Sequence, residues 1–184
     1  MISPASGILL IAEPFLKDPN FIRTVVLLCR HEENEGTFGF VINNLFHQKL
    51  DELIPELDGF DLPVFKGGPV QMDTLHYLHQ YPDLLPDSLK ISDDIYWGGD
   101  FETLKILMHD GLVEREKIKF FLGYSGWENG QLAGEIAEKS WLTVAGNPDI
   151  VFATPLEEIW KTSLILLGGK YEMMIHFPTD PQLN

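Results

Sequence analysis

The stretch that decides the fold lies late in the chain and reads Gly123-Tyr124-Ser125-Gly126-Trp127-Glu128-Asn129-Gly130-Gln131-Leu132. An apolar, strand-like run over residues 118–122 precedes it, and a helix is expected to begin near Glu128 or Asn129. Glycines at such a junction permit a tight corner that directs backbone N–H groups and nearby side chains to one spot. We therefore expect a strand-to-helix corner that gathers ligand-binding side chains. The candidates are Tyr124, Ser125, Trp127 and Gln131.

Other apolar runs predict further strands. Residues 8–12 and 24–29 are apolar almost throughout rather than alternating, which indicates central strands covered on both faces. Glu33-Asn34-Glu35-Gly36 then predicts a hairpin turn. The remaining predicted strands are 38–42, 95–97, 118–122, 142–145 and 171–176.

Helices are predicted from their end signals. Thr154-Pro155-Leu156-Glu157 has the pattern of an N-cap, a first-turn proline and a capping box, with Gly168-Gly169 as the stop. Asp100 predicts the N-cap of a helix that ends at Gly111, and Pro55 makes a helix over 50–57 short or bent. Hairpin-linked strands beside a later strand–helix pattern favour a single α+β domain over residues 1–184.

Composition limits the classes of partner. The 184 residues suffice for one buried core, and 28 acidic against 13 basic residues give a net charge of −15. The basic residues are scattered, whereas binding to nucleic acid or anionic lipid depends on clustered Lys and Arg. Direct nucleic-acid binding is therefore disfavoured. The chain also has no signal-peptide pattern, no membrane-length apolar run and a single cysteine, Cys29, so we expect a cytoplasmic protein.

Ser125 is the first residue to consider for catalysis, because a serine at a strand-to-helix corner resembles a nucleophile elbow. That motif needs glycines two residues to either side, and here Gly123 is present but position 127 is tryptophan. A serine in a tight corner more often bonds to its own backbone. A serine-dependent hydrolase using Ser125, with a histidine such as His31, therefore stays as the alternative, and no catalytic residue is assigned.

Two further patterns are weighed as binding sites. His76 and His79, with Asp73 nearby, would share a face of a helix and could hold zinc, but in a strand the two histidines point to opposite faces. Lys66-Gly67-Gly68-Pro69 lacks the full phosphate-loop pattern, so a structural turn is favoured over an anion-binding nest. No metal and no cofactor are predicted.

Two strand-end residues complete the candidate cleft. Asn43 closes the predicted strand 38–42, and His31 follows the strand 24–29. If these strands are neighbours, both side chains can line the same cleft as the 123–132 stretch. The alternative for Asn43 is a turn hydrogen bond, which asparagine commonly makes after a strand.

Several motifs, spread over residues 5–170, together resemble one known family. They are Gly7-Ile8-Leu9-Leu10-Ile11-Ala12 with Pro14 and Asp18-Pro19; Arg23-Thr24-Val25-Val26-Leu27-Leu28-Cys29 with His31; Gly39-Phe40-Val41-Ile42-Asn43; Gly67-Gly68-Pro69-Val70 with Asp73 and Leu75; and the 123–132 stretch with Glu135, Trp141-Leu142 and Asp149-Ile150-Val151-Phe152 to Trp160.

This combination resembles the YqgE/AlgH family of bacterial proteins. The resemblance implies a compact cytosolic domain with a barrel-like, bifurcated and mainly antiparallel sheet surrounded by helices. The resemblance also suggests a role in transcriptional regulation, since members of the family carry that label, and it implies no catalytic residues. The chain departs from the family pattern at Asn44-Leu45, where Arg-Pro is common, and at Ala133-Gly134, where acidic residues are common.

Taken together, the residues predict a non-enzymatic binding or regulatory domain that acts through a protein or small-molecule partner. The serine hydrolase is the alternative, and a direct DNA-binding regulator ranks last because of the acidic charge.

Overall fold

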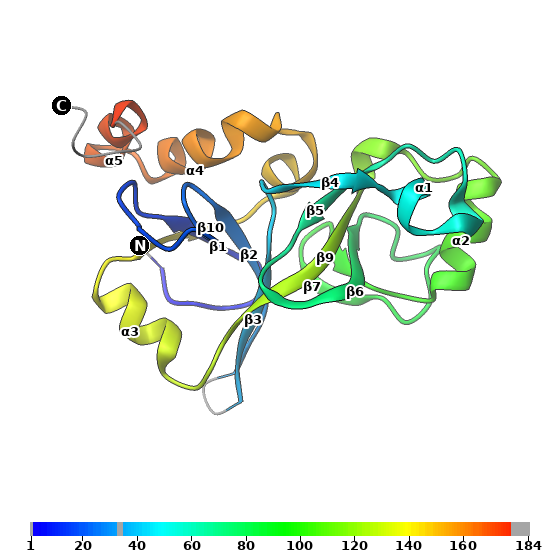
Figure 1. The fold of residues 1–184 in the computed structure, drawn as a ribbon. Coiled ribbons are helices and arrows are strands. Elements are labelled where there is room, and N and C mark those ends of the chain that lie inside the picture. Colours follow the sequence, from blue (N-terminus) through cyan, green and yellow to red (C-terminus); the bar gives the residue numbers. More distant parts are fainter. Residues whose placement is uncertain (1, 33–34, 178–184) are drawn as a thin grey trace.

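The computed structural model describes residues 2–32 and 35–177 and has an α+β fold around one branched sheet (Figure 1). The strand order is β10-β1-β2-β3-β9-β6-β8-β7, with β4 paired to β5 and β5 paired to β9. The strands are β1 (Ile8–Ala12), β2 (Val25–Glu32), β3 (Gly36–Val41), β4 (Leu45–Lys49), β5 (Pro63–Lys66), β6 (Val70–His79), β7 (Leu89–Ser92), β8 (Ile95–Trp97), β9 (Ile118–Trp127) and β10 (Trp141–Ala145). Helices α1 (Leu50–Leu53), α2 (Phe101–His109), α3 (Gln131–Ala137), α4 (Ile159–Leu167) and α5 (Lys170–Met173) surround it.

Strand β9 is where the sheet branches. Its first half lies between β5, which runs parallel to it, and β6, which runs antiparallel. Its second half pairs antiparallel with β3, through Gly39 opposite Ser125. The other described pairings are antiparallel. The expected bifurcated, mainly antiparallel α+β sheet is thus confirmed, and Figure 1 shows β9 running from one half of the molecule into the other.

The glycine motifs mark the place where two backbones cross at this branch. A Cβ on Gly68 would lie 2.2 Å from the carbonyl carbon of Tyr124, and one on Gly67 would lie 2.4 Å from the Gly123 oxygen. The Gly67 carbonyl accepts hydrogen bonds from the Val41 N–H (2.8 Å) and the Ser125 hydroxyl (3.0 Å). The paired glycines therefore serve close backbone approach, as the structural hypothesis for them required.

Both faces of the central strands are covered, as their unbroken apolar sequence predicted. On one face Leu9 and Ile11 pack in the same core as Trp160 of α4. On the other face Leu10 packs in a core with Leu132 of α3. Figure 1 shows α4 and α3 on opposite sides of β1, β2 and β10. A third core, under α2, covers the first half of β9.

The predicted corner at Gly123 is wrong in one respect, because the strand does not end there. Gly123 adopts a φ of 65°, and β9 continues to Trp127, since its second half finds a pairing partner in β3. Helix α3 begins only at Gln131, after Gly130 with a φ of 76°. The residues expected at a strand-to-helix corner are therefore strand residues.

Of the other local predictions, some are confirmed and some are wrong. The predicted strand 171–176 is wrong: this segment is α5 followed by a 3-10 turn (Met174–His176), and Tyr171, Met174 and Ile175 pack on the core at helical spacing. Asp100 caps α2 by accepting from the Thr103 N–H (2.7 Å), as predicted. Thr154 does not cap α4; its hydroxyl donates to the Asp149 carbonyl (3.0 Å).

The β2–β3 hairpin is confirmed by the pairing of Glu32 with Gly36, although residues 33–34 of its predicted turn lie outside the described residues. The segment with His76 and His79 is strand β6, which confirms the strand alternative for it. Within the described residues, every helix falls short of the length and apolarity that crossing a bilayer demands.

Candidate functional site

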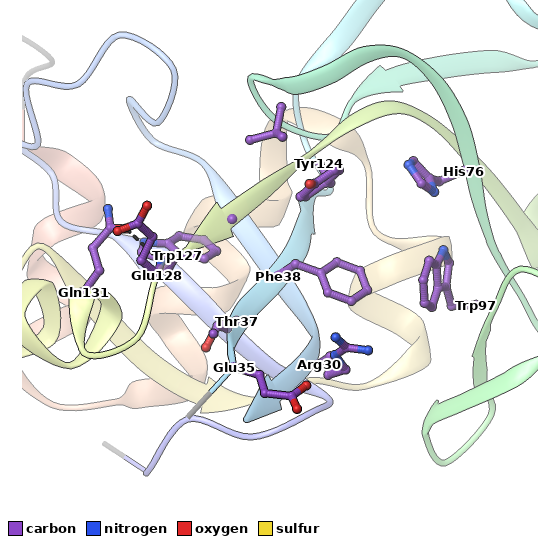
Figure 2. Close-up of a pocket in the computed structure, with 13 residues that line it drawn as sticks. Arg30, Glu35, Thr37, Phe38, His76, Trp97, Tyr124, Trp127, Glu128 and Gln131 are labelled. Carbon is purple, nitrogen blue, oxygen red and sulfur yellow. Dashed lines mark hydrogen bonds between the residues drawn. The ribbon is translucent and has the colours of Figure 1, made fainter. Parts of the chain in front are cut away.

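A pocket of about 730 Å³ opens where the two halves of the sheet diverge (Figure 2). Strands β2, β3, β6, β8 and β9 and the start of α3 contribute its walls. The lining residues are Arg30, Glu35, Gly36, Thr37, Phe38, Val70, His76, Trp97, Tyr124, Gly126, Trp127, Glu128 and Gln131. The branch at β9 creates this space, because β3 and β6 separate on either side of Tyr124.

Four aromatic rings in the pocket form a closed circuit. Neighbouring ring centroids are 4.9 Å apart for Phe38 and Trp97, and 6.1 Å apart for Trp97 and His76. They are 6.1 Å apart for His76 and Tyr124, and 5.9 Å apart for Tyr124 and Phe38. Figure 2 shows the four rings at the corners of a common space. The buried ring of Phe40 lies behind them, 5.1 Å from His76.

Two of these rings carry buried nitrogen atoms that have no hydrogen-bond partner among the described residues, His76 Nε2 and Trp97 Nε1. The same two residues also line a second, mostly apolar cavity of about 350 Å³, and so separate it from the main pocket. Burial lowers the pKa of His76 below its ordinary value, which keeps its imidazole neutral at pH 7. Unpaired buried polar atoms are costly, so a ligand that supplied their partners would gain affinity.

Charged groups lie at the rim. Arg30 places its guanidinium 6.0 Å from the Phe38 ring centroid and pairs with Glu32 through a 3.2 Å contact. Glu35 and Glu128 bring carboxylates to the same opening, as Figure 2 shows. The rim therefore carries more negative than positive charge.

The structure brings only part of the predicted cleft together. Tyr124 lines the pocket with its ring. Trp127 and Gln131 border the pocket, but Trp127 is buried against Trp141, and the Gln131 side chain donates to Glu135 (3.0 Å). Both side chains therefore have a structural role as well as a place at the edge of the pocket.

His31, Asn43 and Ser125 are not among the pocket-lining residues described above. His31 Nδ1 lies 2.6 Å from the Thr37 hydroxyl. Asn43 accepts from the Val25 N–H (2.8 Å) and donates to the Arg23 carbonyl (2.9 Å), so its amide joins two distant segments instead of making the expected local turn bond. Ser125 is fully buried, and its hydroxyl donates to the Gly67 carbonyl of a distant segment (3.0 Å) rather than to its own backbone as expected.

Sequence reasoning did not place Arg30, Phe38, His76 and Trp97 in the cleft. His76 was considered only as a metal ligand. The signal that could have found it is the strand alternative for this segment, because alternation along β6 then separates His76 from His79. His79 is buried and hydrogen-bonds through Nε2 to the Gly98 carbonyl (2.8 Å).

Glu135 of α3 ties the helix to the sheet, and we predict a large cost for its loss. One carboxylate oxygen accepts from both indole N–H groups, of Trp127 (2.8 Å) and Trp141 (2.7 Å). Glu135→Ala leaves both donors without this partner and is expected to lower the free energy of unfolding by about 2 kcal/mol. Chemical denaturation measures this, with Glu138→Ala, at the exposed end of α3, as the matched control. Equal effects of the two substitutions would contradict the assigned role.

The fold and pocket define a class of protein: an α+β domain with a sheet that branches at a shared strand and an aromatic pocket at the branch. A family profile described as AlgH-like matches residues 9–172. The chain belongs to this AlgH-like family.

Known relatives are similar in sequence over nearly the full length of both chains. A UPF0301 protein of Cytophaga hutchinsonii is 42% identical over 179 residues, which cover 97% of this chain and 98% of that protein. Another UPF0301 protein, from Parabacteroides distasonis, is also 42% identical, over 100% of this chain and 93% of that protein.

Two solved structures have the same fold. The AlgH protein of Pseudomonas aeruginosa is 31% identical with a TM-score of 0.73, and the match covers 97% of each chain. A protein of Corynebacterium diphtheriae has a TM-score of 0.77 over 96% of this chain and 94% of that one, at 23% identity, and shows likeness of fold alone.

Proposed function

We propose that this chain is a non-enzymatic binding domain that takes a small organic molecule into the aromatic pocket. The observation that carries the proposal is the pair of buried nitrogen atoms, His76 Nε2 and Trp97 Nε1, which face no partner among the described residues. They belong to residues of a concave pocket that combines five aromatic rings with convergent polar groups, a composition that suits a small-molecule site.

The geometry at Ser125 favours binding over the hydrolase alternative. Its hydroxyl is buried and committed to the Gly67 carbonyl, whereas a serine nucleophile must be exposed and bonded to a base. The net charge of −15 likewise opposes direct contact with DNA phosphates. A regulatory role, as the family label suggests, would then act through the bound molecule and a protein that responds to it.

A thermal-shift screen of small metabolites tests this function. At one hundred times the dissociation constant, a ligand stabilises the folded state by about 2.7 kcal/mol, so the melting temperature is expected to rise by about 7 °C. Trp97→Leu, which removes one wall of the pocket, should abolish the shift. Phe15→Leu removes a ring that stacks on Phe177 away from the pocket and should keep it.

The bound compound should be recovered chemically unchanged after long incubation, as mass spectrometry would detect. A product formed by the wild-type protein would contradict the non-enzymatic proposal. Equal shifts in wild type and Trp97→Leu would show that the pocket is not the site.

A further inference from the structure

We propose that the four-ring pocket binds an organic cation, a methylated ammonium group with a hydrogen-bond-accepting oxygen a few bonds away. This inference rests on the proposed function, because it names the class of ligand for the same pocket. Three independent features carry it: the arrangement of the rings, the charges around them and the two unpartnered nitrogen atoms.

The rings form a cage of the right size. The four neighbouring centroid distances, 4.9, 6.1, 6.1 and 5.9 Å, close a circuit through Phe38, Trp97, His76 and Tyr124. The centre of a square of that side is about 4 Å from each corner, within the range of about 6 Å over which a ring face attracts a cation. The planes of neighbouring rings are inclined by 41° to 90°, so no two neighbours are stacked face to face.

The electrostatics favour a cation over an anion. Aromatic ring faces carry partial negative charge. Glu35 and Glu128 add carboxylates at the rim, and the imidazole of His76 is kept neutral because burial lowers its pKa. Arg30 opposes a cation, but Glu32 pairs with it at 3.2 Å. The whole chain, at −15, attracts cations from solution.

The nitrogen atoms refine the chemistry of the ligand. Indole Nε1–H can only donate, so a ligand oxygen that reached Trp97 would give this buried atom the acceptor it lacks. A primary ammonium carries three N–H donors, and the four rings offer fewer acceptor atoms than that, the neutral His76 nitrogen and the Tyr124 hydroxyl. A methylated ammonium has no N–H groups that need acceptors, because methyl groups cover its surface, and it keeps its positive charge. Choline and betaine have this combination of a methylated ammonium and a nearby oxygen.

The test uses choline and its uncharged isostere dimethylbutanol, in which carbon replaces the ammonium nitrogen. Binding is followed by NMR at the Trp97 indole N–H, identified as the signal missing in Trp97→Phe. Choline is expected to shift this signal in a saturable way, with at least about tenfold tighter binding than the isostere. The two compounds have the same shape, so the difference reports on the positive charge.

A pair of variants at one position separates the ring from the fold. Tyr124→Phe keeps the ring and should retain choline binding, whereas Tyr124→Leu should weaken it by about tenfold. Phe15→Leu, outside the pocket, serves as the control and should bind as wild type does. Loss of binding in Tyr124→Leu with unchanged thermal unfolding supports the cage. Unchanged binding in that variant overturns it.

The remaining outcomes separate failure of this inference from failure of the proposed small-molecule binding. A trimethyl-lysine peptide that binds more tightly than choline would keep the ammonium class and identify a protein as its source. Equal affinity for choline and dimethylbutanol would overturn the inference. If neither choline, betaine nor the peptide binds while another metabolite shifts the Trp97 signal, the inference fails and the proposed function stands. If no compound shifts that signal, both fail.

Discussion

Gly68→Ala is expected to prevent this chain from reaching its native sheet under ordinary conditions. The added Cβ would lie 2.2 Å from the carbonyl carbon and oxygen of Tyr124 and 2.3 Å from the nitrogen of Ser125. All three are backbone atoms of β9, so no side-chain rotation can relieve the clash, and the backbones must separate at the branch of the sheet. The expected loss is about 4 kcal/mol or more, at the extreme of single substitutions. Circular dichroism and chemical denaturation measure it.

The control for this prediction is Gly134→Ala in helix α3. A Cβ there would meet no atom within 4 Å, so the substitution adds helix propensity without a clash. It is expected to stabilise the protein by about 0.8 kcal/mol. If Gly68→Ala were tolerated as well as Gly134→Ala, the two backbones could not cross as closely as described, and the structural account of the glycine motifs would be wrong.

The same crossing explains how much of the fold the sequence could predict. The central strands and the cap of α2 follow from local patterns, because unbroken apolar runs and Asp100 carry their signals within a few residues. The course of β9 through Gly123 could not be predicted in this way. A glycine with positive φ reads as a corner, and only the distant partner β3 keeps the chain extended to Trp127.

For a related reason, the sequence could predict some residues of the candidate site and not others. Tyr124 was found because it lies in the glycine-rich stretch itself. The rings of Phe38, His76 and Trp97 come from three other strands, β3, β6 and β8, which only the sheet pairing brings to one place. Ser125 was misplaced, because the buried hydrogen bond to the Gly67 carbonyl is a contact across 58 residues of sequence.

The branch therefore couples the fold to the pocket. Gly123 rotates β9 at the point where β5 gives way to β3 as its partner. The next residue, Tyr124, then faces Phe38 and His76 rather than the core under α2. The glycine motif thereby positions an aromatic ring at the mouth of the split sheet, in the pocket that we propose as the binding site.

Lys119 gives the second large effect, a stability that depends on pH. Its side chain is 9% exposed, with Nζ donating to the Val151 carbonyl (3.1 Å) and lying 4.2 Å from the Phe65 ring centroid. Among the described residues it belongs to none of the ion pairs. Burial without a carboxylate lowers the pKa of Lys119 from 10.5 to about 7.

The direction of the pH effect follows from this lowered pKa. Between pH 7 and pH 10.5 the unfolded chain holds a proton on Lys119 that the folded chain has released. The free energy of unfolding therefore rises with pH across this window, by up to about 1.4 kcal/mol per unit and about 4 kcal/mol in total. Below the folded pKa both states are protonated, and the full cost of burying the charge is present.

Lys119→Met removes the charge and keeps a flexible apolar side chain of similar length. It also removes the hydrogen bond to Val151, so the variant is expected to be about 2 kcal/mol more stable than the wild type at about pH 6 and about 2 kcal/mol less stable at about pH 10, a change of about 4 kcal/mol across this range. The difference between variant and wild type isolates Lys119 from every other titrating group. Lys117→Met is the control, because the Lys117 side chain is partly exposed and its surface pair with Glu114 (2.6 Å) contributes little. A wild-type and a Lys119→Met protein with parallel stability profiles from pH 6 to pH 10 would mean that the amine stays charged in the core, held by the carbonyl and the ring.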